Sequence, residues 1–128
     1  MSRTVLVVDD EVSIVEFLRD LLRMEGFEVH AAFDAEQALD RIREHIYDLA
    51  IIDFNLPDMD GVMLHRRIRQ MDFELASRTL FASGLVQSEA NLGYYASQAA
   101  GFIAKPFDME RVVRAVHEIL GDPVEDDV

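Results

Sequence analysis

The feature that most constrains the fold is a regular alternation between short, continuous apolar runs and longer segments of helical periodicity. Residues 4–8 form a run of mainly β-branched and aliphatic side chains, which is typical of a strand buried on both faces of a sheet. In the segment that follows, apolar residues recur at i, i+3, i+4, i+7 and i+8, namely Ile14, Phe17, Leu18, Leu21 and Leu22. This spacing predicts a helix with one apolar face.

The same pair of patterns occurs five times, and the expected strands are residues 4–8, 27–31, 49–52, 79–83 and 102–104. A helix is expected after each strand, the fourth within residues 87–100, with Asp34 and Asp108 as N-caps of the second and the last. This order predicts an α/β fold, a parallel sheet with helices on both faces. We expect one domain over residues 1–121, followed at 122–128 by an acidic flexible tail or the start of a linker.

Composition argues against several classes of protein. The formal net charge is −13, whereas phosphate binding requires clustered lysine and arginine, so we expect no direct nucleic-acid binding by this domain. No apolar run reaches about 18 residues, and the N-terminus lacks the apolar core of a signal peptide. The chain has no cysteine, which excludes disulfides and thiol chemistry. We therefore expect a cytoplasmic protein that does not contact membranes.

Polar side chains lie at the end of four of the five expected strands or directly after it: Asp9, Asp10, Asp53, Ser83 and Lys105. Ligands of open α/β sheets bind at the carboxyl ends of the strands, so these side chains are expected to converge. Each also has a local alternative, since the acids could cap a helix or a turn, the serine could bond its own backbone and the lysine could lie in solvent. Lys105 is the only lysine of the chain, beside eleven arginines, and its compact ammonium suits a site that holds one oxygen.

Three carboxylates within a few ångströms of one another repel, which raises the pKa of at least one of them. A divalent cation relieves this repulsion, and a few carboxylates with backbone carbonyls and water suit Mg²⁺. A zinc site is not expected, because the four histidines fall on different elements with no pair at metal-ligand spacing: His30, His45, His65 and His117.

Taken together and in order, these residues resemble the receiver domains of two-component response regulators over about residues 3–121. The matching segments are Asp9-Asp10 after the first strand, residues 53–61 (DFNLPDMDG) after the third, Ser83 after the fourth and Lys105-Pro106-Phe107 after the fifth. The resemblance implies a flavodoxin-like, doubly wound (βα)5 fold with a parallel five-stranded sheet in the order 2-1-3-4-5.

The resemblance also implies a phosphoryl-transfer site. Asp53 would be the phosphoacceptor, whose carboxylate attacks a phosphoryl group held on a histidine. Asp10 and Asp53 would bind Mg²⁺ directly, together with the backbone carbonyl of Asn55, and Asp9 would act mainly through water. The metal would screen the carboxylate from the phosphoryl oxygens.

Further residues would act on the transferred group. Lys105 would pair with Asp53 before the transfer and with the phosphoryl oxygens after it, and Ser83 would donate a hydrogen bond to the same group. By resemblance, Phe102 on the fifth strand would turn inward when Ser83 moves, and a simple core position for Phe102 is an equal alternative. The peptide bond between Lys105 and Pro106 would be cis.

The function implied is a switch rather than an enzyme, although the site would assist its own phosphorylation and dephosphorylation. The phosphoryl donor would be a sensor histidine kinase or a histidine phosphotransfer protein, the downstream effector is unknown, and the domain would be a monomer or a phosphorylation-linked homodimer. Alternatives are an Mg²⁺-dependent phosphohydrolase with an aspartate nucleophile, a flavodoxin-like cofactor binder and a phosphorylation-independent interaction module. Asn55 stands where such hydrolases place a general acid, and the acidic loop after the first strand would repel an anionic cofactor.

Overall fold

In the computed structural model of the chain, residues 3–84 and 101–121 are described. They contain one sheet of five parallel strands in the order β2-β1-β3-β4-β5. The strands are β1 (Thr4–Val8), β2 (Glu28–Ala32), β3 (Leu49–Asp53), β4 (Thr79–Ser83) and β5 (Gly101–Ala104). The predicted fold class and strand order are therefore confirmed.

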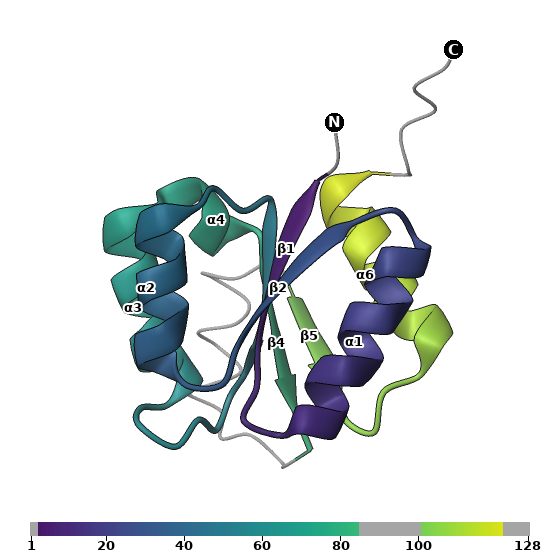
Figure 1. The fold of residues 1–128 in the computed structure, drawn as a ribbon, viewed down its shortest axis with the longest axis horizontal. Coiled ribbons are helices and arrows are strands. Elements are labelled where there is room, and N and C mark those ends of the chain that lie inside the picture. The colour runs from purple at the N-terminus through teal and green to yellow at the C-terminus, as the bar shows by residue number, and fades with distance from the viewer. Residues whose placement is uncertain (1–2, 85–100, 122–128) are drawn as a thin grey trace.

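Helices cover both faces of this sheet. On one face lie α1 (Val12–Met24) and α6 (Met109–Leu120), and on the other lie α2 (Ala35–Glu44), α3 (Gly61–Met71) and α4 (Phe73–Ser77) (Figure 1). Each face has its own hydrophobic core. The alternation of patterns in the sequence thus produces three layers, with the sheet in the middle.

The central strands are buried on both of their faces. Every residue of β3 and β4 is buried, and so is every residue of β1 except Thr4. Successive side chains enter opposite cores: Leu6 packs with α2 and α3, whereas Val7 packs with α1 and α6. Burying one such side chain contributes roughly 1.5–3 kcal/mol, so these runs hold the residues that follow them at the carboxyl edge of the sheet.

Two helix N-termini are capped as predicted. The side chain of Asp34 accepts a hydrogen bond from the N–H of Gln37 at 2.8 Å, and that of Asp108 accepts one from the N–H of Glu110 at 2.8 Å. The last helix ends before Gly121, whose φ of +82° lies in the left-handed region that favours glycine. Both boundaries of α6 therefore follow from local side-chain chemistry.

The structure differs from the prediction at four places, and the first is β3, which ends one residue later, at Asp53. The strand β2 begins and ends one residue later, because Thr4 aligns with Glu28, and Phe27 instead packs in the core beneath α1. The strand β5 begins one residue earlier, at Gly101. The short helix α4 was not predicted; Asp72 both ends α3 and caps α4 by accepting a hydrogen bond from the N–H of Leu75.

Two predicted segments, the helix within residues 87–100 and the tail at 122–128, lie outside the described residues. Within the part of the chain that is described, no helix is long and apolar enough to cross a membrane. The longest of them, α1, has 13 residues, against about 20 needed to span the hydrocarbon of a bilayer.

Candidate functional site

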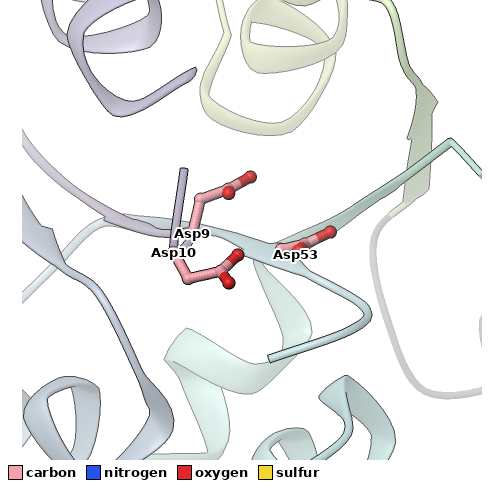
Figure 2. A group of neighbouring side chains, drawn as sticks. All are labelled: Asp9, Asp10 and Asp53. Carbon is pink, nitrogen blue, oxygen red and sulfur yellow. The ribbon is translucent and has the colours of Figure 1, made fainter. Parts of the chain in front are cut away.

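The carboxyl ends of β1 and β3 bring three aspartates together. Asp53 is the last residue of β3, and Asp9 and Asp10 directly follow β1. Because the chain passes from β1 to β2 on one side and to β3 on the other, this edge is where the strand order reverses and where open α/β sheets bind ligands. Figure 2 shows the three side chains gathered here, and one carboxylate oxygen of each lies within 4.8 Å of the others.

Two of these aspartates are buried. Asp9 and Asp53 are 2% and 6% exposed, whereas Asp10 is exposed. A buried carboxylate is costly unless it is paired or hydrogen-bonded. Asp9 meets this need twice, since its Oδ1 accepts a hydrogen bond from the N–H of Glu11 at 2.9 Å and its Oδ2 lies 2.9 Å from Nζ of Lys105.

Lys105 directly follows β5, and its side chain reaches the aspartates. Besides its contact with Asp9, its Nζ lies 3.4 Å from Oδ1 of Asp53 and 3.5 Å from Oε1 of Glu11. Its backbone N–H donates to the carbonyl of Ser83 at 3.0 Å. Burial acts to lower the pKa of Lys105, but the hydrogen bond with Asp9 and the charge on Asp53 outweigh it and raise that pKa. The side chain is therefore an ammonium ion at neutral pH.

The surroundings of Asp53 disfavour the charged form of its carboxyl group. Burial raises the pKa of Asp53 from 3.8 to about 6, and the charge on Asp9 adds to the rise, while Lys105 and a hydrogen bond from the backbone of Asn55 oppose it. Asp53 is still largely ionised at neutral pH. The carboxylates of this cluster thus hold more negative charge than the neighbouring protein groups stabilise, and such perturbed groups are typical of functional sites.

Ser83 and Asn55 belong to segments next to Asp53. Ser83 is the last residue of β4 and is 2% exposed, and Asp53 on the neighbouring strand aligns with Ala82. Asn55 is exposed in the loop after β3, where it forms an isolated bridge with Asp60. Ser83 therefore ends the strand next to that of Asp53, and Asn55 lies two residues after Asp53 in the loop.

The remaining predicted residues belong to β5 and the turn after it. The peptide bond between Lys105 and Pro106 is cis. Phe102 is 39% exposed, whereas its neighbour Ile103 is buried in the core under α1 and α6. The simple core position considered for Phe102 is therefore not observed.

The residues present suit a hard divalent cation. Their donors are carboxylate oxygens, and Mg²⁺ is commonly held by one or two carboxylates while it keeps several waters. A single ammonium, that of Lys105, faces the carboxylates of Asp9, Glu11 and Asp53, so negative charge remains for a cation to neutralise. Within residues 3–84 and 101–121, the three aspartates are the only group of three or more acidic or histidine side chains close enough to share an ion.

The histidines are less scattered than their positions in the sequence indicate. The rings of His30 on β2 and His45 after α2 are in edge contact, with centroids 4.8 Å apart. His30 is also hydrogen-bonded to the hydroxyl of Tyr47 at 2.7 Å and to Glu28 at 3.0 Å. This contact joins the edge strand to the loop before β3, and no sequence spacing predicts it.

The chain matches the response regulator receiver domain family over residues 5–117. The chemotaxis protein CheY of Bacillus subtilis is 33% identical over 121 residues, which cover 94% of this chain and 99% of CheY. Response regulator GtcR of Aneurinibacillus migulanus is 40% identical over 89% of this chain and 46% of GtcR. Response regulator ArlR of Staphylococcus aureus is 33% identical over 91% of this chain and 52% of ArlR. The chain thus spans nearly all of CheY and about half of each of the two longer regulators.

Solved structures agree with this assignment. Chemotaxis protein CheY4 of Vibrio cholerae superposes with a TM-score of 0.85 at 27% identity, covering 93% of this chain and 99% of that one. A putative response regulator of Chloroflexus aurantiacus superposes with a TM-score of 0.84 at 32% identity, covering 94% and 98%. The chain belongs to the receiver domain family of two-component response regulators, whose members are signalling switches that work with histidine kinases and downstream effectors.

Proposed function

We propose that the chain is a phosphoaccepting switch in which Asp53 receives a phosphoryl group from a phosphorylated histidine of a sensor histidine kinase or a histidine phosphotransfer protein. The observation that carries this proposal is the meeting of three aspartates with the only lysine of the chain at one edge of the sheet. Asp53 is the candidate nucleophile because its strand lies between β1, which precedes the other two aspartates, and β4, which ends in Ser83.

The transfer forms one bond and breaks one. A carboxylate oxygen of Asp53 forms the new bond to phosphorus, while the bond from phosphorus to the histidine nitrogen breaks and its electron pair returns to the imidazole. No proton has to leave Asp53, because it reacts as a carboxylate. At neutral pH it is in that form, since its pKa of about 6 lies below the pH.

The other two aspartates would serve a metal ion. Asp10 and Asp53, with the backbone carbonyl of Asn55, would hold Mg²⁺ directly, and Asp9 would act mainly through water. When bound, Mg²⁺ supplies the positive charge that lets an anionic phosphoryl group approach a carboxylate. The mutual repulsion of these carboxylates supports this proposal, because the charge on Asp9 is the largest contribution, after burial, to the raised pKa of Asp53.

Lys105 and Ser83 would bind the transferred group. Nζ of Lys105 lies 3.4 Å from Oδ1 of Asp53. It is therefore close enough to donate a hydrogen bond to an oxygen of a phosphoryl group bound to Asp53. The hydroxyl of Ser83, at the end of the next strand, would donate to another. A phosphoryl group adds negative charge and three strong acceptors, which would draw the ends of β4 and β5 toward it. Phe102, which is 39% exposed, would change its position with them and alter the binding of an effector or of a second copy.

Loss of the phosphoryl group would follow from the same site. Water would attack the phosphorus, the bond from phosphorus to the carboxylate oxygen of Asp53 would break, and inorganic phosphate would leave while Asp53 returns to a carboxylate. The residues that assist the transfer would assist this reaction. Asn55, two residues after Asp53, has an amide that cannot protonate a leaving group. This favours a switch with a transient acyl phosphate over a hydrolase of phosphate monoesters.

The test is the intact mass of the protein after incubation with a small acyl phosphate, with and without Mg²⁺. We expect the unsubstituted protein to gain one phosphoryl group only with Mg²⁺, and Asp53→Asn to gain none. Asp40→Asn, which removes an exposed carboxylate on α2 that pairs with Arg43, is the matched control and should behave as the unsubstituted protein. Equal gain by Asp53→Asn would contradict the proposal. No gain from this donor or from a phosphorylated histidine protein would indicate an interaction module that works without phosphorylation.

A further inference from the structure

The loop after β3 carries another aspartate, Asp58, for which the proposed chemistry has no use. Its two carboxylate oxygens reach across to α2, where Oδ1 accepts a hydrogen bond from the N–H of Ala35 at 2.9 Å and Oδ2 accepts one from the N–H of Glu36 at 3.0 Å. We propose that Asp58 is a positioning residue, which clamps this loop to α2 and thereby holds the carbonyl of Asn55 where Mg²⁺ binds. This inference rests on the proposed function.

The contact is a strong one for an exposed side chain. The first N–H groups of a helix have no partner within the helix, and Asp58 supplies acceptors for two of them, while Asp34 supplies one for Gln37. A carboxylate at this end also interacts favourably with the helix dipole. Burial acts to raise the pKa of Asp58, but the hydrogen bonds from Ala35 and Glu36 outweigh it and lower that pKa, so the side chain is ionised.

The other contacts of the loop do not fix its tip in this way. Asn55 and Asp60 form a bridge that closes the loop on itself, and Leu56 and Met59 pack, partly buried, against the core under α2 and α3. Apolar packing is not directional. Asp58 therefore supplies directional hydrogen bonds between this loop and α2. Asn55, three residues before Asp58, is exposed, and its backbone is hydrogen-bonded to Asp53 and bridged to Asp60, so the position of Asn55 relative to α2 depends on the contacts of Asp58.

Metal binding and the hydrogen bonds of Asp58 should be coupled, which is not expected of a contact that only stabilises the fold. If the hydrogen bonds of Asp58 favour metal binding, then metal binding must stabilise those hydrogen bonds by the same factor. Mg²⁺ should therefore slow hydrogen exchange at the amides of Ala35 and Glu36, although neither residue belongs to the metal site. The effect should disappear when Asp58 is replaced by alanine.

The experiment compares Mg²⁺ affinity, measured by calorimetric or NMR titration, in Asp58→Ala, Asp58→Asn and Asp34→Ala. Asp34→Ala is the matched control, because it removes one negative charge and one hydrogen bond of 2.8 Å from the same helix end without touching the loop. Measurement at high salt screens the loss of a distant charge. We expect Asp58→Ala to weaken binding by about tenfold, which corresponds to about 1.4 kcal/mol and is typical of a lost helix cap. Asp58→Asn keeps an acceptor oxygen and should fall in between, and Asp34→Ala should bind as the unsubstituted protein does.

Three results would overturn the inference, and each is distinct. Unchanged affinity in Asp58→Ala, with no change in exchange at Ala35 and Glu36, would show that the loop needs no clamp. Equal weakening in Asp58→Ala and Asp34→Ala would show that both act only through the stability of α2. Absence of Mg²⁺ binding by the unsubstituted protein would refute the proposed function itself, and the role of Asp58 with it.

Discussion

Replacing Asp53 with asparagine should stabilise the metal-free domain while removing its response to Mg²⁺. Burial and the neighbouring charge on Asp9 raise the pKa of Asp53 from 3.8 to about 6. Each unit of pKa corresponds to about 1.4 kcal/mol, so the charged form costs at most about 3 kcal/mol at neutral pH relative to the neutral form. Solvent reaches the cluster at the exposed Asp10 and screens the charge, so we expect the charged form of Asp53 to cost about 1–2 kcal/mol.

The pH dependence of this gain has a definite sign. In the folded state Asp53 holds its proton more tightly than in the unfolded chain, so its contribution to stability is greatest at low pH and is lost as the pH rises from about 4 through about 6. Asparagine is neutral throughout this range. The difference in unfolding free energy between Asp53→Asn and the unsubstituted protein should therefore be near zero at about pH 4 and complete above about pH 7.

Urea unfolding measures this difference in unfolding free energy. Circular dichroism is the suitable signal, because the chain has no tryptophan whose fluorescence could report unfolding. Above about pH 7 the thermal midpoint of Asp53→Asn should be higher by roughly 3–8 °C. Mg²⁺ at ten times its dissociation constant should add about 1.4 kcal/mol to the unsubstituted protein and nothing to Asp53→Asn. Asp40→Asn should show neither effect. A metal-free Asp53→Asn that is less stable than the unsubstituted protein above pH 7 would refute the electrostatic reasoning.

Three further predictions concern the buried His65, Gly61 close to Asp53, and Lys105 in the site. Burial lowers the pKa of His65 below 6.5, so the domain should lose stability as the pH falls below about 6.5, and urea unfolding should show a flatter pH profile for His65→Phe. Gly61→Ala should lower the unfolding free energy by about 1–3 kcal/mol, because the new Cβ would lie 3.0 Å from Cα of Phe54; Gly84→Ala, whose nearest contact is 3.6 Å, should have a much smaller effect. Lys105→Met should lower the stability of the metal-free domain by about 1–3 kcal/mol and enlarge the stabilisation by Mg²⁺, and an unchanged response to Mg²⁺ would contradict this.

The layers of the fold could be predicted because each strand and each helix has its own apolar period. The runs at β1, β3 and β4 are buried almost throughout, which is what a continuous apolar run predicts for a central strand. Such runs do not indicate which strands pair with one another in the sheet. The order 2-1-3-4-5 was implied by the resemblance to receiver domains. The short helix α4 was missed because Asp72 ends one helix and caps the next, so the helical pattern has no visible break.

The candidate site could be predicted because a residue that follows a parallel strand must lie at the carboxyl edge of the sheet. Distances within the site depend on side-chain conformation, and the sequence does not predict that Lys105 lies nearer to Asp9, at 2.9 Å, than to Asp53, at 3.4 Å. Asp58 contacts Glu36 and Ala35, which precede it in the chain by 22 and 23 residues. Nothing in the local pattern distinguishes Asp58 from an ordinary acidic residue of a surface turn.

The central claim is that Asp53 carries the phosphoryl group. The most direct measurement is to phosphorylate the protein in the presence of Mg²⁺, trap the acyl phosphate chemically, and identify the modified residue by fragmentation in a mass spectrometer. We expect the modification on Asp53 and on no other carboxylate. Modification of Asp9 or Asp10 in its place would contradict the assignment of the acceptor.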